Sequence, residues 1–432
     1  MQFTLKWHPT QPQLPAEELA TFAELSLLVN NTSLFRNEDL LEQRFIQEGI
    51  NIGSYPLAFW LVVNWWRLRW EAALPANTTA MQKIDWQMSH SLGAAGQGYY
   101  WPDLTFASDT QSIHLQLKLH QDKIGGIRYL EAYSGKITAQ QFETAVFKLI
   151  EQTLEQLNSK GLKNTDLHQA WADLKEDLNQ ADRFRYRQLE AQLGFDQNEG
   201  ELNYITKLLE VENQFGHSAV DEVTQAEKNK TLEVLQAVKN QLNQSKSLIS
   251  FENTQVKNNT SDKTLQPWVA GQKAAQELRN NWAINSGFIS NEQLADRLMA
   301  SKNLWQELST SEVNLAAAQA EANKTAKVIL GKTRPFAQRF MLARIIGDYL
   351  YTASGEKTLV CTTGKTYRQK YQRAFAQELL CPYAALIERL GTVEPDDEAI
   401  SEAAEYFLVS PLVVNTVLVN KGHLPSTQLE DH

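Results

Sequence analysis

Cysteine is scarce in this chain of 432 residues, in which Cys361 and Cys381 are the only two. Two cysteines cannot build a disulfide framework, so we expect a protein of the reducing cytoplasm. The first residues lack the basic segment and apolar segment of a signal peptide, and none is predicted. The most apolar run, PLAFWLVVNWW, is too short to cross a bilayer, so no membrane partner is predicted.

A basic overall charge is also missing, because the net charge is −10. The composition as a whole therefore gives no case for binding nucleic acid. None of the eight histidines has another histidine three or four residues away, the spacing at which two imidazoles on one helix can share a metal. The sequence thus predicts no metal and no cofactor.

Proline is absent between Pro102 and Pro267, although six prolines occur in the first 102 residues. This change separates an irregular beginning from a long helical middle. We predict a Trp-rich α+β domain over 1–135, a helical region over 136–250, a linker over 251–266 and a helical domain over 267–432. The expected fold class is α+β and mostly helical.

Within the first domain, hydrophobic periodicity predicts a buried helix over 56–72 and a half-buried strand over 112–120. Apolar and polar residues alternate strictly along the strand segment, SIHLQLKLH. Segments 104–108 and 127–133 are predicted as the strands on its two sides.

Polar residues interrupt the apolar helix at Asn64, Arg67 and Glu71. Buried polar groups need partners, and His90 with the glycine-rich segment 93–103 is a candidate source. The cluster predicts either a structural hydrogen-bond network or a small ligand or peptide pocket. An enzyme that uses His90, Glu71 and Arg67 is a further alternative. The segment is also rich in tryptophan, which normally forms core: Trp60, Trp65, Trp66, Trp70, Trp86 and Trp101.

Four ordered segments of the last 165 residues carry a family resemblance: 268–301, 339–351, 368–382 and 398–422. Together they resemble the ImmA/IrrE family of bacterial metallopeptidases. The resemblance implies a zincin-like, mainly helical domain in which 339–351 is the helix that normally carries His-Glu-x-x-His. It also implies that the third zinc ligand is the glutamate at the position of Gln369.

At these positions the chain carries residues unsuited to zinc chemistry. Arg344 and Ile345 replace the first histidine and the catalytic glutamate, and Asp348 and Gln369 replace the other two ligands. A cation has no lone pair to donate, and an isoleucine cannot accept a proton. We therefore predict no catalytic residue, no zinc and no peptide hydrolysis. Arg344 and Asp348, four residues apart on one helix, are expected to form an ion pair in the place of the metal. The alternative to a functional cleft is a relict cleft that this ion pair closes and that has no function.

Positive charge gathers between residues 332 and 373, where nine basic residues face Asp348 and Glu356, for a net charge of +7. Such a patch suits phosphate or an acidic partner, and four tyrosines could stack on bases there: Tyr349, Tyr351, Tyr367 and Tyr371. A solvated surface is the alternative. The candidate binding residues of this cleft are Arg339, Arg344, Asp348, Lys365, Arg368, Gln369, Lys370 and Arg373.

By the resemblance, we expect a catalytically inactive cytoplasmic protein that binds another protein as an adaptor or regulatory subunit. The family's associations suggest stress response, toxin–antitoxin regulation or anti-phage defence. Nucleic-acid binding by the basic patch and an N-terminal active site are the alternatives, and the oligomeric state stays open.

Overall fold

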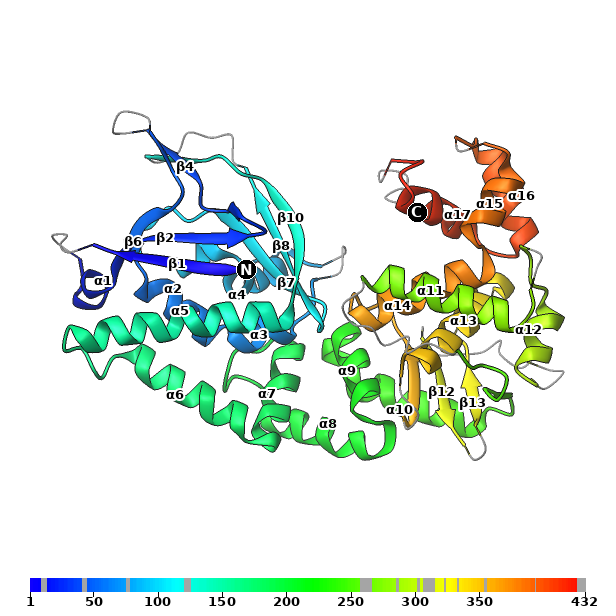
Figure 1. Cartoon of the computed structure of the whole chain (residues 1–432). Helices are drawn as coiled ribbons and strands as arrows, with labels where there is room; N and C mark the ends of the chain where they lie inside the picture. Colours follow the sequence, from blue (N-terminus) through cyan, green and yellow to red (C-terminus); the bar gives the residue numbers. More distant parts are fainter. Residues whose placement is uncertain are drawn as a thin grey trace. The chain divides into compact units, whose positions relative to one another are not determined.

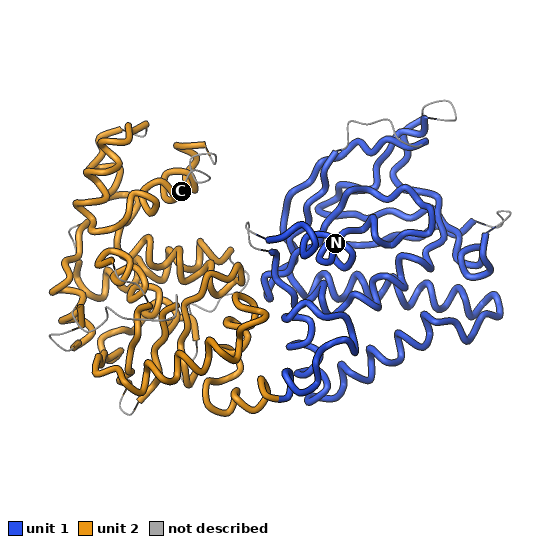
Figure 2. The backbone as a smooth tube through the Cα atoms, turned by 180° about the vertical axis from the view of Figure 1, so that it is seen from behind, with its two compact units in different colours: residues 1–206 blue, residues 207–432 orange. Residues whose placement is uncertain are grey.

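The structure is a computed structural model that describes residues 1–8, 14–40, 45–74, 78–119, 126–256, 266–284, 287–300, 304–305, 315–321, 324–331, 334–352, 356–392 and 394–425. Over these residues the chain is mixed α/β and mainly helical, with small antiparallel sheets, which confirms the coarse prediction of fold class (Figure 1). It divides into two compact units, 1–206 and 207–432 (Figure 2). The division falls within helix α8, Leu202–Phe215, inside the predicted helical region 136–250.

Three antiparallel sheets belong to the first unit. In the first sheet β2 pairs with β1, β3 and β6, and the other two have the orders β10-β8-β7 and β5-β4-β9. Their bounds are β1 Gln2–Trp7, β2 Phe22–Val29, β3 Thr32–Ser33, β4 Asn37–Asp39, β5 Ile46–Gln47, β6 Ile50–Gly53, β7 Asp103–Ser108, β8 Ser112–Lys118, β9 Ile127–Tyr129 and β10 Tyr133–Thr138.

Strand β8 confirms the alternating pattern, because Ile113, Leu115 and Leu117 are fully buried and the residues between them are not. The prediction for its neighbours is half right. Strand β7 pairs with β8 as expected, but β8's other partner is β10, and β9 pairs with β4 in a different sheet. His120, the last residue of the predicted strand, lies outside the described residues.

Helices of the first unit are α1 Ala16–Ala20, α2 Tyr55–Val63, α3 Trp65–Trp70, α4 Ala80–His90, η1 Leu92–Ala95, α5 Ala139–Ser159, α6 Asp166–Asn179 and α7 Ala181–Leu193. The single helix predicted over 56–72 is two helices, which meet at Asn64. The Asn64 Nδ2 donates to the Trp60 carbonyl oxygen over 2.9 Å, and such local side-chain bonds compete with regular helix. Helix α2 packs on α5 and α6.

The second unit contains a four-stranded antiparallel sheet of order β11-β13-β12-β14, which the prediction of a helical domain missed. Its strands are β11 Leu248–Ser250, β12 Ala316–Ala320, β13 Thr325–Ile329 and β14 Thr358–Cys361. Directly after β11, the buried Phe251 ring stacks on Tyr349 at 4.0 Å between centroids. The start of the predicted linker 251–266 is thus packed, whereas its residues 257–265 lie outside the described part.

Helices of the second unit are α9 His217–Ala226, η2 Lys228–Lys230, α10 Thr231–Gln244, α11 Pro267–Asn281, α12 Asn291–Arg297, α13 Pro335–Tyr351, α14 Tyr367–Leu380, α15 Tyr383–Leu390, α16 Asp397–Phe407 and α17 Pro411–Asn420. Helix α14 packs against both α11 and α13. Glycines permit the close approach. A Cβ on Gly271 would lie 2.5 Å from the Tyr371 carbonyl oxygen, and one on Gly347 would lie 2.7 Å from the Phe375 ring.

In the described part of the chain, no single helix is long and apolar enough to cross a membrane. Helices α16 and α17 meet the length and composition criteria only when taken together, and they are bent by 110°.

Candidate functional site

Helix α13 carries Arg344 and Asp348, which occupy two positions of the zinc motif implied by the resemblance. Pro335 occupies its first turn, where the missing backbone donor costs nothing. Its middle, from Met341 to Asp348, is buried on all sides between the sheet and α14. Arg344 is only 4% exposed and Asp348 is fully buried. Both charges therefore need partners from neighbouring elements.

Arg344 finds those partners on α14 and at the end of β14. Its Nη2 donates to the Thr362 carbonyl oxygen over 2.8 Å and to Oε1 of Gln369 over 2.5 Å, with Oε1 of Gln372 at 3.2 Å. All of these acceptors are neutral. Burial lowers the pKa of Arg344, and the fields of Cys361, Asp348 and Glu222 oppose this shift.

The predicted ion pair between Arg344 and Asp348 is wrong, because Asp348 pairs with Arg368 instead. Arg368 donates from Nε and Nη2 to the two carboxylate oxygens, each over 2.6 Å, and Val360 N donates to Oδ2 over 3.1 Å. This is the bidentate geometry in which a guanidinium and a carboxylate form two parallel hydrogen bonds. Against the effect of burial, Asp348 raises the pKa of Arg368, which is also buried.

Two glutamines of α14 connect this ion pair to the sheet. Nε2 of Gln369 and Nε2 of Gln372 both donate to the Val360 carbonyl oxygen, over 3.1 and 2.9 Å. Oε1 of Gln369 also accepts from Thr362 N over 2.9 Å. We call Arg344, Asp348, Arg368, Gln369 and Gln372 the arginine network. Its members hydrogen-bond to one another and to the backbone of β14 and Thr362, so the network holds α13, α14 and β14 together.

The arginine network does not fit a zinc ion. A zinc ligand must offer a lone pair, and the guanidinium of Arg344 has none. Both oxygens of Asp348 already accept hydrogen bonds, and Gln369 uses its amide for the backbone and for Arg344. Among the described residues no group of three His, Cys, Asp or Glu side chains could hold a metal.

Glu222 also belongs to this neighbourhood, and it was not among the residues predicted from the sequence. It lies on α9, far from α14 in sequence, and its Oε2 accepts from Thr366 Oγ1 over 2.7 Å. Thr366 is the N-cap of α14. Burial raises the pKa of Glu222 to about 6, although Arg368 acts in the opposite direction. A helix pattern marks a glutamate as a surface residue, so only the tertiary structure reveals this one.

The remaining candidate residues do not gather on one basic surface. Arg339 is buried and donates to Asn291 Oδ1 over 2.8 Å and to the Ile289 carbonyl oxygen. Arg373 donates to the Gly364 carbonyl oxygen over 3.0 Å. Lys365 is exposed and Lys370 is partly exposed.

In the described part of the chain, the candidate arginines of the predicted patch thus point inward and bond to neutral or acidic groups. Of the tyrosines expected to stack on bases, Tyr367 and Tyr371 are buried and Tyr349 packs on Phe251. Lys332, another member of the patch, lies outside the described residues. Binding of nucleic acid stays a prediction for the lysines that remain at the surface.

In the first unit, three of the four predicted polar residues meet. Arg67 Nε donates to Glu71 Oε2 over 2.7 Å, and His90 Nε2 lies 3.0 Å from the same oxygen. The other guanidinium nitrogens reach Asp196 and Asp85, at 2.9 and 3.0 Å. The fourth, Asn64, lies apart from them and donates to the Trp60 carbonyl oxygen of α2.

His90 is held on both ring nitrogens. Nδ1 lies 2.9 Å from the Phe106 carbonyl oxygen, which can only accept, so Nδ1 carries a proton. Trp86 stacks on this ring at 4.1 Å, with planes 7° apart. This closed arrangement supports a structural network, and an N-terminal active site stays an untested alternative.

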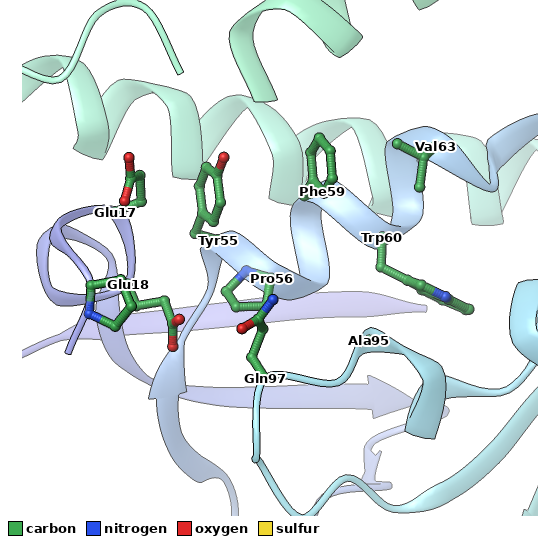
Figure 3. Close-up of a pocket in the computed structure, with 10 residues that line it drawn as sticks. Glu17, Glu18, Tyr55, Pro56, Phe59, Trp60, Val63, Ala95 and Gln97 are labelled. Atoms are coloured by element: carbon green, nitrogen blue, oxygen red, sulfur yellow. The ribbon is translucent and has the colours of Figure 1, made fainter. Parts of the chain in front are cut away.

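The glycine-rich segment 93–103 does not supply the partners of Arg67. It instead forms one side of a pocket of about 360 Å³ between α1 and α2, to which Ala95 and Gln97 contribute (Figure 3). None of Asn64, Arg67, Glu71 and His90 is in the described lining of this pocket, so a ligand pocket at the predicted polar cluster stays a prediction. Compared with protein-family models, curated proteins and solved structures, the chain gives no match.

Proposed function

We propose that the second unit has a zincin-like fold of the ImmA/IrrE kind that has lost its metal, and that the protein acts by binding rather than by hydrolysis. One observation carries the proposal. The three positions that the resemblance assigns to zinc ligands converge in space, although Gln369 lies on a different helix from Arg344 and Asp348. Gln369 touches Arg344 directly and shares the backbone of Val360 with Asp348.

The same geometry supports the absence of hydrolytic chemistry. A peptidase needs an open metal position and a general base beside it. Here the converging side chains form hydrogen bonds to one another and to the backbone, and Ile345 at the position of the base is buried. A binding or regulatory subunit, with another protein as its partner, is the function that this arrangement supports best.

Restoring the motif tests the proposed fold. The variant combines Arg344→His, Ile345→Glu, Asp348→His and Gln369→Glu, and zinc is measured by mass spectrometry of the folded protein. We expect one zinc per chain in this variant, less in a control that keeps Gln369, and none in the unchanged protein. A folded variant that takes up no zinc would contradict the zincin-like assignment, and a zinc-containing unchanged protein with peptidase activity would contradict the loss of catalysis.

Affinity capture from the host tests the binding role separately. The control variant carries Lys365→Glu and Lys370→Glu, because substitutions of the buried Arg344 or Arg368 would disturb the fold. A protein partner lost in the control places the interface near the N-terminus of α14, and a partner kept by both places it elsewhere. If neither form captures a reproducible partner, the binding role is contradicted. Capture of nucleic acid with a steep salt dependence would favour the alternative.

A further inference from the structure

A pocket of the first unit has the size of a small-molecule site and an unusual lining. Its volume of about 360 Å³ is within the range of ligand sites, and apolar side chains form most of its wall (Figure 3). Helix α1 closes one end with Glu17 and Glu18, and α2 forms the long side. The described lining includes neither lysine nor arginine. Negative charge therefore meets an apolar surface without a compensating cation.

Aromatic rings on α2 form the apolar side. Tyr55 and Phe59 lie one helical turn apart, with ring centroids separated by 6.1 Å and planes that differ by 2°. Figure 3 shows both rings along the same face of α2. Trp60 follows Phe59 on α2, and a hydrogen bond from its Nε1 to the Met88 carbonyl oxygen, over 3.1 Å, orients its ring. The faces of such rings carry negative potential and attract cations.

Glu18 is the polar anchor of the pocket. Glu18 is only 6% exposed, and the Tyr99 hydroxyl donates a hydrogen bond to its Oε2 over 2.7 Å. The Tyr99 oxygen in turn accepts from Gly53 N over 3.0 Å. The other carboxylate oxygen, Oε1, has no hydrogen-bond partner among the described residues. In Figure 3 the carboxylate is turned toward the side of the pocket where Pro56 and Gln97 lie.

Gly53 explains how a carboxylate comes to be held so deeply. A Cβ on this residue would lie 2.9 Å from both Cα and Cβ of Glu18, so only glycine lets α1 rest on β6 at this distance. The surroundings are negative as well. Burial and the nearby Asp166 and Glu17 raise the pKa of Tyr55. Burial, together with Glu18, raises the pKa of Tyr99 to about 12.

We propose that this pocket binds an alkylammonium group attached to an apolar body, with the ammonium at Glu18 and the body against Phe59 and Trp60. An ammonium supplies a hydrogen-bond donor for Oε1 of Glu18 and a positive charge that balances its carboxylate, and the aromatic side chains of α2 offer apolar surface to the body. An acidic ligand would be repelled, and a neutral one would leave the carboxylate unmatched. The group can belong to a free amine or to a lysine side chain of a peptide. This inference concerns the first unit alone and does not depend on the proposed loss of zinc.

Charge-matched probes test it with the full chain. Isothermal titration calorimetry compares n-hexylamine with 1-hexanol and hexanoate, which share its apolar body. We expect n-hexylamine to bind most tightly and hexanoate not at all. The peptide acetyl-Ala-Lys-Ala-amide then distinguishes the two sources, because tighter binding of the peptide identifies lysine and tighter binding of the amine identifies a free ligand.

Two substitutions locate the site. Glu18→Gln keeps an acceptor for Tyr99 but removes the charge, and we expect the affinity for n-hexylamine to fall about 10- to 100-fold. Phe59→Leu keeps the apolar wall but removes the ring, and should weaken binding about 2- to 5-fold. The control Glu155→Gln removes an exposed carboxylate of α5 and should change nothing.

The proposal is overturned if the amine and the alcohol bind equally, if no amine binds at millimolar concentration, or if folded Glu18→Gln binds as the unchanged protein does. Thermal unfolding shows whether each variant is folded. Should Glu18→Gln not fold, the order of the three probes and the effect of Phe59→Leu decide.

Discussion

Removing one partner of the ion pair between Asp348 and Arg368 should cost the second unit more stability than breaking a surface pair. Replacing Asp348 by asparagine keeps the shape of the side chain but leaves the buried guanidinium without its counter-charge. Removal of one partner from a buried pair costs about 3–5 kcal/mol of unfolding free energy. Glu222 is a second carboxylate whose field acts on Arg368, so we expect Asp348→Asn to lie near 3 kcal/mol. The exposed pair of Lys6 and Glu24 should contribute less than about 1 kcal/mol when Lys6 is replaced by alanine.

A double-mutant cycle gives the decisive measurement. Arg368→Gln removes the charge from the other side, and in the double variant two neutral amides face each other. We expect the double variant to lose no more stability than either single one, which corresponds to a coupling of about 3 kcal/mol. Urea unfolding gives the free energies, and hydrogen exchange in peptides from α13 and α14 assigns the change to the second unit. Additive effects, with a coupling below about 0.5 kcal/mol, would refute the reasoning.

Two further predictions concern the same unit. The pKa of Glu222 rises from 4.5 to about 6 on folding, so the native state binds more protons between these values and its stability falls as the pH rises. Glu222→Gln should remove a loss of about 2 kcal/mol between pH 4.5 and 6, as measured by urea unfolding at several pH values, and parallel curves for both proteins would disprove this. Gly347→Ala places a methyl group 2.7 Å from the Phe375 ring and should cost about 1–3 kcal/mol in a thermal or urea melt. Gly93→Ala, with its nearest atom at 3.8 Å, is the matched control and should cost less.

Periodicity predicted the elements whose burial follows a regular pattern. In strand β8 the buried residues Ile113, Leu115 and Leu117 alternate with polar residues. The buried face of this strand can therefore be predicted from the sequence alone. Helix α5 is a similar case, because its apolar residues recur at helical spacing over Ala139–Ser159. In both elements a single periodic face contacts the core.

Other elements owe their form to partners distant in the sequence. Strand β12 reads Ala-Ala-Ala-Gln-Ala, a composition with high helix propensity, yet pairing with β13 and β14 holds it extended. The candidate site shows the same limit. Helical spacing made Arg344 and Asp348 natural partners, but the tertiary structure supplies Gln369 and Arg368 at better geometry. Which of several arginines reaches a buried carboxylate depends on the path of α14, and one sequence does not reveal it.

The arginine network has a consequence for how this sequence can change over generations. Each member is a hydrogen-bond partner of a buried neighbour, so a single substitution leaves a buried charge or amide without its partner. Several substitutions made together can replace both partners at once. Arg344→His alone would deprive Gln369 and Gln372 of a donor without creating a metal site. The route from this arrangement to one that binds zinc therefore passes through less stable intermediates, and mutational history at these positions is coupled. Under the proposed zincin-like assignment, a loss of zinc ligands that such a network has fixed is difficult to reverse one residue at a time.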